Sequence, residues 1–149
     1  MIFDNLSLKI KDFSELTTYE LYEIVRARTS VFLLEQRIIC QDFDGVDYNS
    51  LHCFLEDEDS VVAYLRAFRT ESNAIKIGRV LSTTHGIGLG SFLMKKALPE
   101  IVKRLGCNLI TLHAQKQAQA FYEKLGFTVT SPEFLEENIP HVEMKLLYI

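Results

Sequence analysis

Residues 75–94 constrain the fold of this chain more than any other stretch, because they join an apolar run, a glycine-rich turn and an amphipathic segment. The apolar run predicts a buried strand, and the spacing of the later apolar residues predicts a helix. Gly86, Gly88 and Gly90 lie between them. Amides at the start of a helix carry partial positive charge, and glycines let a phosphate come close to the backbone. The stretch therefore predicts a site for a phosphate-bearing ligand.

Two familiar phosphate-binding patterns do not fit this turn. A Walker P-loop has Lys and then Ser or Thr after its last glycine, whereas Gly90 is followed by Ser91 and Phe92. A dinucleotide-binding G-x-G-x-x-G pattern begins at Gly86 and Gly88, but Ser91 replaces its third glycine, and no parallel βαβ unit opens the chain. On the glycines alone, a connection with purely structural duties fits as well as a phosphate site.

Composition and length exclude several classes of protein. A chain of 149 residues is expected to form one domain, residues 1–149. The net charge of -4, without a basic run, argues against nucleic-acid binding. No apolar run approaches the ~18 residues of a membrane span, and the start has no signal-peptide pattern. Three cysteines without C-x-x-C spacing predict reduced thiols in a cytoplasmic protein rather than disulfides or a zinc site.

Hydrophobic periodicity in the first half predicts one strand, one helix and a meander. Alternation predicts a strand at Ser7–Asp12. A capping box at Thr17–Glu20 begins a helix that is expected to reach about Leu33. Three strands with short connections then form an antiparallel meander at Leu51–Glu56, Val61–Arg69 and Ile75–Leu81.

The second half predicts two helices and three further strands. The helix after the glycines should run to about Leu105, and Pro99 inside it predicts a kink near residues 95–99 or a helix in two pieces. The expected elements that follow are a strand at Asn108–Ala114, a helix at Gln115–Leu125, a strand at Phe127–Thr130, an acidic loop at Ser131–Asn138 and a strand at Ile139–Tyr148. The order β-α-βββ-α-β-α-ββ predicts an α+β fold with a mixed sheet.

A second segment, Ala118–Phe127, gives the glycine turn a more specific meaning. Its Phe-Tyr-Glu-Lys-Leu-Gly-Phe run, placed after a meander and the turn His85–Gly90, resembles the GNAT acyl-CoA N-acetyltransferases. The residues at Val31–Gln36, Gln41–Gly45 and Ile139–His141 look like the ElaA-type branch of that superfamily. The resemblance covers nearly the whole chain. It implies an α/β three-layer arrangement, with a mixed, mostly antiparallel central sheet and helices on both faces.

The resemblance implies acetyl-CoA as co-substrate and no metal. The pyrophosphate would lie over the amides of the glycine turn, and the pantetheine arm would follow the strand before it, where GNAT sheets splay. The cofactor contacts implied in this way are Val80, Leu81, His85, Gly86, Ile87, Gly88, Leu89, Gly90, Ser91 and Gln115. Two of these positions depart from the usual pattern, because His85 replaces Arg or Gln and Gln115 replaces a frequent Asn.

The same resemblance implies that Tyr122 is the general acid that protonates the departing thiolate. The alternative is that its ring only packs against Phe127. For the base that deprotonates the acceptor amine, Glu35 and His141 are the leading candidates. The other candidates are Asp42, Asp44, His113 and a relaying water.

The acidic stretch 41–47 and two arginines complete the set of candidate functional residues. The spacing of the acidic residues does not match a calcium loop. The stretch is expected either to form a rim that attracts a cationic amine or to cap its own backbone. Arg28 lies on an apolar helical stripe and needs a partner, either Glu35 or a later aspartate. Arg79 is expected to form an ion pair or to orient a carboxylate, with Glu35 as one partner.

The sequence thus predicts an enzyme that moves an acetyl group from acetyl-CoA to a primary amine. The acceptor stays open among small molecules, such as polyamines, amino acids and drug-like amines, and peptide N-termini. The alternatives are a non-enzymatic acyl-CoA-binding or sensor module and a protein-binding scaffold. A homodimer is compatible with the sequence. No nucleic-acid or membrane partner is expected.

Overall fold

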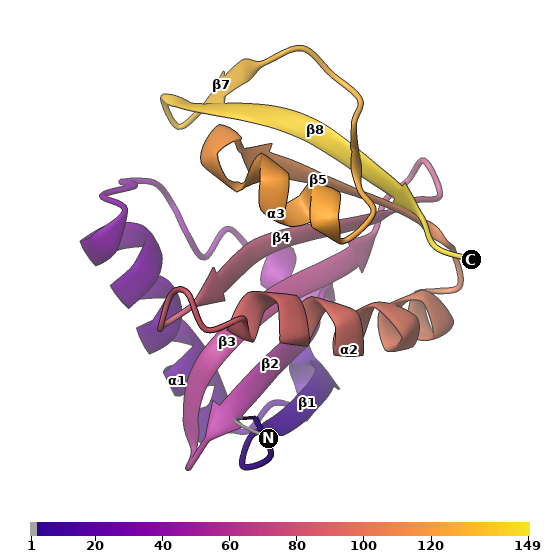
Figure 1. Ribbon diagram of the computed structural model, residues 1–149. Helices are drawn as coiled ribbons and strands as arrows, with labels where there is room; N and C mark the ends of the chain where they lie inside the picture. Colours follow the sequence, from indigo (N-terminus) through magenta and orange to yellow (C-terminus); the bar gives the residue numbers. More distant parts are fainter. Residues whose placement is uncertain (1–2) are drawn as a thin grey trace.

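A computed structural model describes residues 3–149 and shows one eight-stranded sheet between helices (Figure 1). The strand order is β1-β2-β3-β4-β5-β8-β6, and β7 pairs with β8. The strands are β1 (Ser7–Asp12), β2 (Leu51–Asp57), β3 (Ser60–Arg69), β4 (Ile75–Ser82), β5 (Leu109–Gln115), β6 (Thr128–Val129), β7 (Phe134–Glu136) and β8 (Ile139–Leu147). Among the strands of residues 3–149, only β4 and β5 pair in parallel. The predicted mixed, mostly antiparallel sheet is confirmed.

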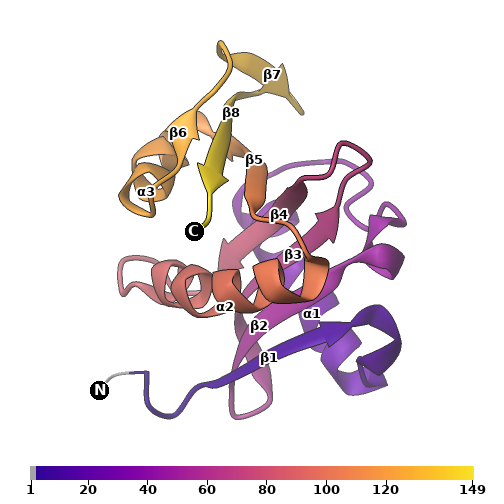
Figure 2. The ribbon, with the colours of Figure 1, turned by 90° about the vertical axis from the view of Figure 1, so that its right-hand side faces the viewer.

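Two helices cover opposite faces of the sheet, α1 (Thr18–Arg28) and α2 (Leu89–Leu105), and the shorter α3 (Gln119–Lys124) packs beside β5 (Figure 2). Alternation along β2 and β3 separates two cores. Cys53 and Leu65 belong to the core under α2, whereas Phe54 and Tyr64 belong to the core under α1. Within residues 3–149, no helix is long and apolar enough to cross a membrane.

The first helix begins at the predicted capping box. The Glu20 amide donates to Thr17 Oγ1 at 3.0 Å, and the Thr17 amide donates to Glu20 Oε1 at 2.9 Å. The helical backbone continues past Arg28 as a π-helix over Thr29–Glu35. The helical segment therefore extends two residues beyond the predicted end at Leu33.

Some predicted boundaries in the second half were wrong. α2 is continuous through Pro99, so the helix is not broken into two pieces. β5 extends to Gln115, and a 3₁₀ turn at Lys116–Ala118 precedes α3, so the second helix starts later than predicted. The expected acidic loop 131–138 contains β7, because Glu137 and Asn138 both have positive φ and close a two-residue hairpin onto β8.

The sheet opens between β4 and β5. These strands pair only from Ile75 with Ile110 to Ile77 with Leu112, and they diverge beyond that point. Arg79 has a φ of 55° beside a register shift between β3 and β4, which marks a bulge at the start of the opening. The splay implied by the family resemblance is therefore present.

Candidate active site

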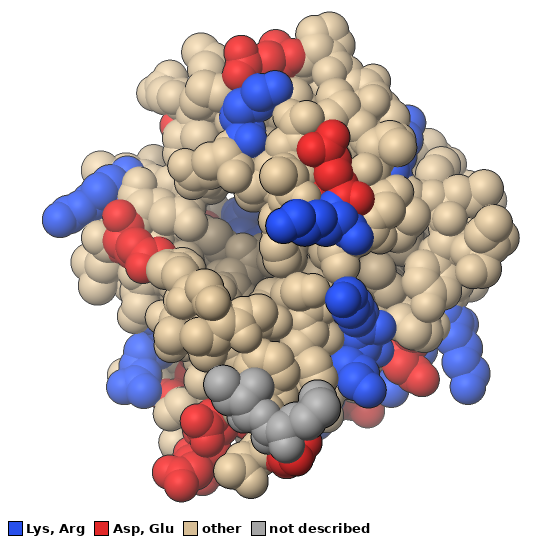
Figure 3. All heavy atoms as spheres, viewed as in Figure 1, with Lys and Arg blue, Asp and Glu red and all other residues tan. Residues whose placement is uncertain are grey.

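Two cavities meet at the opening between β4 and β5. The first, called here the loop cavity, has a volume of about 640 Å³ and is lined by the loop before β2, by β4 and β5, and by the β7–β8 hairpin. The second, the glycine cavity, has a volume of about 560 Å³ and is lined by the turn before α2 and by α3. Both are lined by Gln36, Val80, Ala118 and Tyr122. Figure 3 shows the surface hollowed between these segments.

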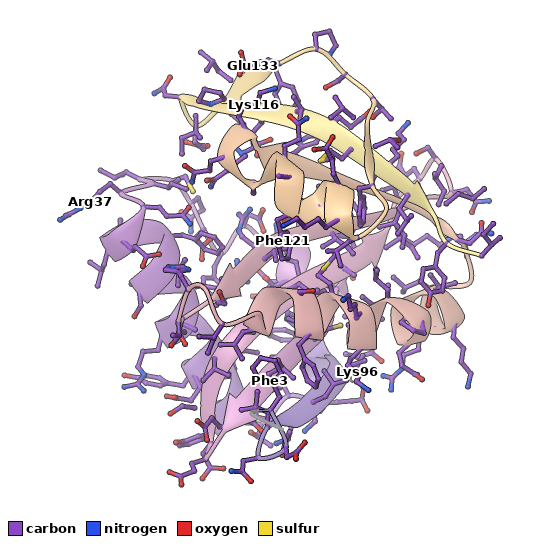
Figure 4. The ribbon with its side chains drawn as sticks, viewed as in Figure 1. Phe3, Arg37, Lys96, Lys116, Phe121 and Glu133 are labelled. Carbon is purple, nitrogen blue, oxygen red and sulfur yellow. The ribbon has the colours of Figure 1, made fainter. Side chains whose placement is uncertain are left out.

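The glycine cavity is built on backbone conformations that favour glycine. Gly86 and Gly88 have φ values of 79° and 85°, and Gly88 caps α2 without a side-chain hydrogen bond. A Cβ on Gly90 would come within 3.3 Å of the Phe121 ring, which points from α3 toward this turn (Figure 4). The 17-residue α2 thus presents amides at its N-terminus to an open cavity.

Eight of the ten predicted cofactor contacts line this cavity. They are Val80, Leu81, His85, Gly86, Gly88, Leu89, Gly90 and Ser91. Ile87 is 43% exposed and is not among the lining residues, and Gln115 lines the loop cavity instead. Lys95 and Lys124 also line the glycine cavity, although sequence reasoning missed both. The signal for Lys95 was its position one helical turn after Ser91.

Gln115 and His85, two of the predicted cofactor contacts, each contact a side chain at the end of the π-helix. Gln115 Nε2 donates to Gln36 Oε1 at 2.9 Å, which joins the end of β5 to the end of the π-helix. His85 Nε2 lies 3.0 Å from both carboxylate oxygens of Glu35. Glu35 lines neither cavity, so the structure does not bring this predicted base together with Tyr122.

Tyr122 is 7% exposed and lies where the two cavities meet. Its ring packs edge-on against Phe121, at 5.0 Å between centroids, and against Phe127, at 5.8 Å. Burial raises the pKa of its hydroxyl. The residue therefore carries its proton at neutral pH. The predicted packing against Phe127 is present, and Tyr122 also lines both cavities.

Histidines from two strands share one carboxylate in the loop cavity. His113 Nδ1, on β5, lies 2.8 Å from Glu136 Oε1, at the end of β7. His141, on β8, has Nδ1 at 2.7 Å from the Ile139 carbonyl and Nε2 at 3.7 Å from Glu136 Oε2. Phe134 contacts both imidazole rings. The sequence placed both histidines near the cleft, but gave no sign that Glu136 joins them.

Three arginines neutralise the acidic loop. Arg28, which is fully buried, lies 2.5 Å from Asp47 Oδ1 and 3.0 Å from Asp42 Oδ2. Its partners are thus the aspartates and not Glu35. Arg79 lies 2.8 Å from Asp42 Oδ1, so the expected ion pair of Arg79 is present, with Asp42 rather than Glu35.

The predicted acidic rim is therefore wrong, because these carboxylates are held in ion pairs. Arg66 donates to both oxygens of Asp44, at 2.8 and 3.0 Å. These hydrogen bonds, against an opposing effect of burial, lower the pKa of the Asp44 carboxyl to about 2. Asp44 Oδ1 also accepts from the Val46 amide at 3.1 Å, which confirms the capping interpretation at this residue.

The histidine, cysteine and acidic side chains were also compared with metal-ligating arrangements. Among residues 3–149, no group of three or more His, Cys, Asp or Glu side chains is placed to hold a metal ion. Cys40, Cys53 and Cys107 are free thiols. Cys40 is exposed and lines the loop cavity, whereas Cys53 is buried in the core.

Comparison with known proteins gives these features a family context. The sequence profile described as an acetyltransferase (GNAT) domain matches residues 26–148. The chain is 32% identical over 137 residues to protein ElaA of Escherichia coli (strain K12), covering 88% of this chain and 90% of ElaA. It is also 34% identical over 146 residues to a UPF0039 protein of Schizosaccharomyces pombe, covering 95% and 97% of the two chains.

Solved structures agree with these sequence matches. The crystal structure of an acyl-CoA N-acyltransferase from Pseudomonas aeruginosa has a TM-score of 0.87 at 34% identity and covers 94% of this chain and 98% of its own. The crystal structure of Escherichia coli ElaA has a TM-score of 0.86 at 29% identity, with the same coverage. The splayed sheet and the glycine turn thus lie within an acyl-CoA acyltransferase fold.

Proposed function

The chain belongs to the GNAT acetyltransferase family and is related to ElaA, and on this premise we propose that it transfers an acetyl group from acetyl-CoA to a primary amine. One observation carries the proposal. Tyr122, a protonated phenol, lies where the glycine cavity joins the loop cavity. A two-substrate transfer needs two binding spaces that meet at one proton donor.

The residues of the glycine cavity fit the phosphates of coenzyme A. The free amides at the start of α2 would hold the pyrophosphate, and Lys95 and Lys124 add positive charge to the same cavity. Gly86 and Gly88 add no side chain to the wall of this cavity. Backbone groups of β4 near Val80 would hold the pantetheine arm, as an added strand would.

The loop cavity would hold the acceptor amine. The amine nitrogen attacks the thioester carbonyl, and an amide near Val80 would stabilise the oxyanion, an effect worth about 3 kcal/mol in other enzymes. Tyr122 then gives its proton to the departing thiolate. Of the two bases predicted first, His141 lines the loop cavity and Glu35 does not. The acceptor is a small-molecule or peptide amine.

Acetyl-CoA binding is tested first by thermal unfolding. A ligand that binds only the folded state stabilises it by about 2.7 kcal/mol at a hundredfold excess over Kd, which raises Tm by roughly 5–10 °C for a chain of this size. Adenosine at the same concentration is the control. No change in Tm at millimolar acetyl-CoA would contradict the proposal.

Turnover is tested next with a panel of amines, by following the release of free thiol. The panel contains polyamines, amino acids, aromatic and alkyl amines, hydrazides and short peptides. At least one acceptor should raise thiol release above the hydrolysis background. A Tm shift without release for any amine would favour the second candidate, a non-enzymatic acyl-CoA-binding module.

A further inference from the structure

Glu136 and His113 form a carboxylate–imidazole pair on the wall of the loop cavity. The distance between Glu136 Oε1 and His113 Nδ1 is 2.8 Å. Both residues line the cavity, and their side chains keep 46% and 30% of their surface exposed. A substrate in the loop cavity can therefore reach them.

The fold fixes this pair from two directions. Glu136 ends β7, and the two-residue turn at Glu137 and Asn138 ties that strand directly to β8. The edge of Phe134 packs on the His113 ring, at 5.1 Å between centroids and 76° between planes. A short hairpin and an aromatic contact thus hold the carboxylate and the imidazole in one arrangement.

The carboxylate determines which nitrogen of His113 carries the proton. An ionised carboxylate only accepts hydrogen bonds, so Nδ1 must be the protonated nitrogen of the neutral ring. The lone pair then lies on Nε2, at the opposite edge of the imidazole. Among residues 3–149, no group forms a hydrogen bond with this Nε2. A neutral imidazole oriented in this way is a competent proton acceptor.

His141 is less suited to the same task. Its side chain is only 8% exposed, its Nδ1 faces the Ile139 carbonyl, and its Nε2 faces Glu136 at 3.7 Å. Its ring is also stacked on Phe134. Both ring nitrogens are thus directed at protein oxygens. Other charged and titratable groups line the same cavity as His113 or pair with it on β8. They are Cys40, Asp42, Asp44, Arg66, Lys76, Arg79, Glu137 and Glu143.

We propose that His113 is the general base of the acetyl transfer and that Glu136 is its positioning residue. This inference rests on the proposed function. His113 Nε2 takes one proton from the acceptor ammonium and passes it to solvent, and the freed nitrogen lone pair forms the C–N bond. When the C–S bond breaks, the Tyr122 proton goes to sulfur. The second nitrogen proton leaves to solvent, from which Tyr122 regains its own. One proton is thus released per acetyl group transferred.

Nitrogen NMR of the intact protein tests the arrangement without an acceptor. Long-range ¹H–¹⁵N spectra should show His113 as the Nδ1–H tautomer when neutral. Glu136→Gln should give a mixture of tautomers, because an amide can donate as well as accept. Glu133→Gln is the matched control, since Glu133 is an exposed residue of the same segment and lines neither cavity (Figure 4). An Nε2–H tautomer in the wild-type protein would overturn the proposal.

Kinetics with two acceptors from the panel then test the chemical role. A base is needed for an alkylamine, which is an ammonium ion at the assay pH, but much less for a hydrazide, which is already neutral. His113→Gln should lower kcat/KM about 100-fold for the alkylamine and less than tenfold for the hydrazide. Glu136→Gln should show the same contrast with a smaller loss, and Glu133→Gln should match the wild type.

The possible failures are distinguishable. Equal losses for both acceptors would mean a structural role for His113 and would overturn the base assignment alone. Unchanged turnover in His113→Gln, with a wild-type thermal unfolding curve, would do the same. No turnover of any amine by the wild-type protein would remove the base assignment together with the proposed acetyl transfer.

Discussion

Tyr122 is the residue whose removal separates catalysis from binding most directly. Tyr122→Phe keeps the ring and its packing against Phe121 and Phe127 but removes the hydroxyl proton. Turnover should fall by about 100-fold, because the thiolate loses its acid, whereas the Kd for acetyl-CoA should change less than twofold. Steady-state rates and a thermal-shift titration measure the two effects. Unchanged turnover would leave Tyr122 with a packing role only.

At the scale of single residues, the sequence predicted roles that depend only on neighbouring positions in the chain. Gly86 and Gly88 need positive φ, and both were identified from the turn itself. Partners far apart in the chain were not predictable. Glu35 and His85 are fifty positions apart, and nothing in either local sequence points to their contact. Glu136 was missed for the same reason, since its role depends on a hairpin and a strand that meet only in the folded chain.

Among the elements, α1 holds the acidic loop in place through one arginine. Arg28 is fully buried and contacts Asp42 and Asp47, so its removal leaves uncompensated buried charge. Arg28→Met should lower the free energy of unfolding by about 3–5 kcal/mol. Lys103→Met is the control, because Lys103 is an exposed residue of α2. It should change stability by less than about 0.5 kcal/mol.

Urea unfolding of the two variants measures both effects. Similar losses for Arg28→Met and Lys103→Met would contradict the clamping role of Arg28. The sequence indicated that Arg28 needs a partner, because a charge on an apolar stripe is unusual. It did not indicate which carboxylate, since the choice depends on how the loop after the π-helix folds back over the sheet.

The ends of helices and strands were predicted well where side-chain patterns mark them. They were predicted poorly where the conformation of a turn determines them. The capping box at Thr17 and the short connection between β2 and β3 gave boundaries within a residue or two. The β7–β8 hairpin was missed because its turn is Glu137–Asn138, without the glycine that usually marks such a turn. Pro99 was expected to kink α2 or to divide it into two pieces, and the second alternative is wrong, because the helix continues through Leu93, Ala97 and Ile101 on its buried face.

For the whole molecule, acid stability should depend on buried and paired carboxylates. Burial raises the pKa of Glu20, but hydrogen bonds from Lys9, the Thr17 amide and Lys11 outweigh it and bring that pKa to about 2. Asp44 has a similarly lowered pKa of about 2. Both folded values lie below those of an unfolded chain, near 4. Their contributions are therefore complete above pH ~4–5 and are lost as the pH falls toward 2.

Urea unfolding between pH 5 and pH 2 checks this dependence. Each lowered unit of pKa corresponds to about 1.4 kcal/mol, so the free energy of unfolding should fall by a few kcal/mol across the interval. Glu20→Gln should flatten the dependence, whereas Glu71→Gln, at an exposed turn, should leave it unchanged. A wild-type pH dependence in Glu20→Gln would contradict the assignment.

The overall topology followed from the order of elements and from two motifs read together, the glycine turn and the segment around Tyr122. The two cavities did not follow from the sequence. They depend on the bulge at Arg79, on the divergence of β5 from β4 after Ile77, and on the Gln36–Gln115 hydrogen bond across the opening. Each of these arises from tertiary contacts that local sequence patterns do not carry.

The meeting of two cavities at four shared residues has a consequence for inhibitor design. A single molecule that joins coenzyme A to an amine through an acetyl-sized spacer could place one half in each cavity without leaving the protein surface. Once one half is bound, the other is held at high effective concentration, so the affinity of the linked compound exceeds that of either half. Varying the amine half while keeping the coenzyme half constant would turn binding strength into a direct report on the acceptor.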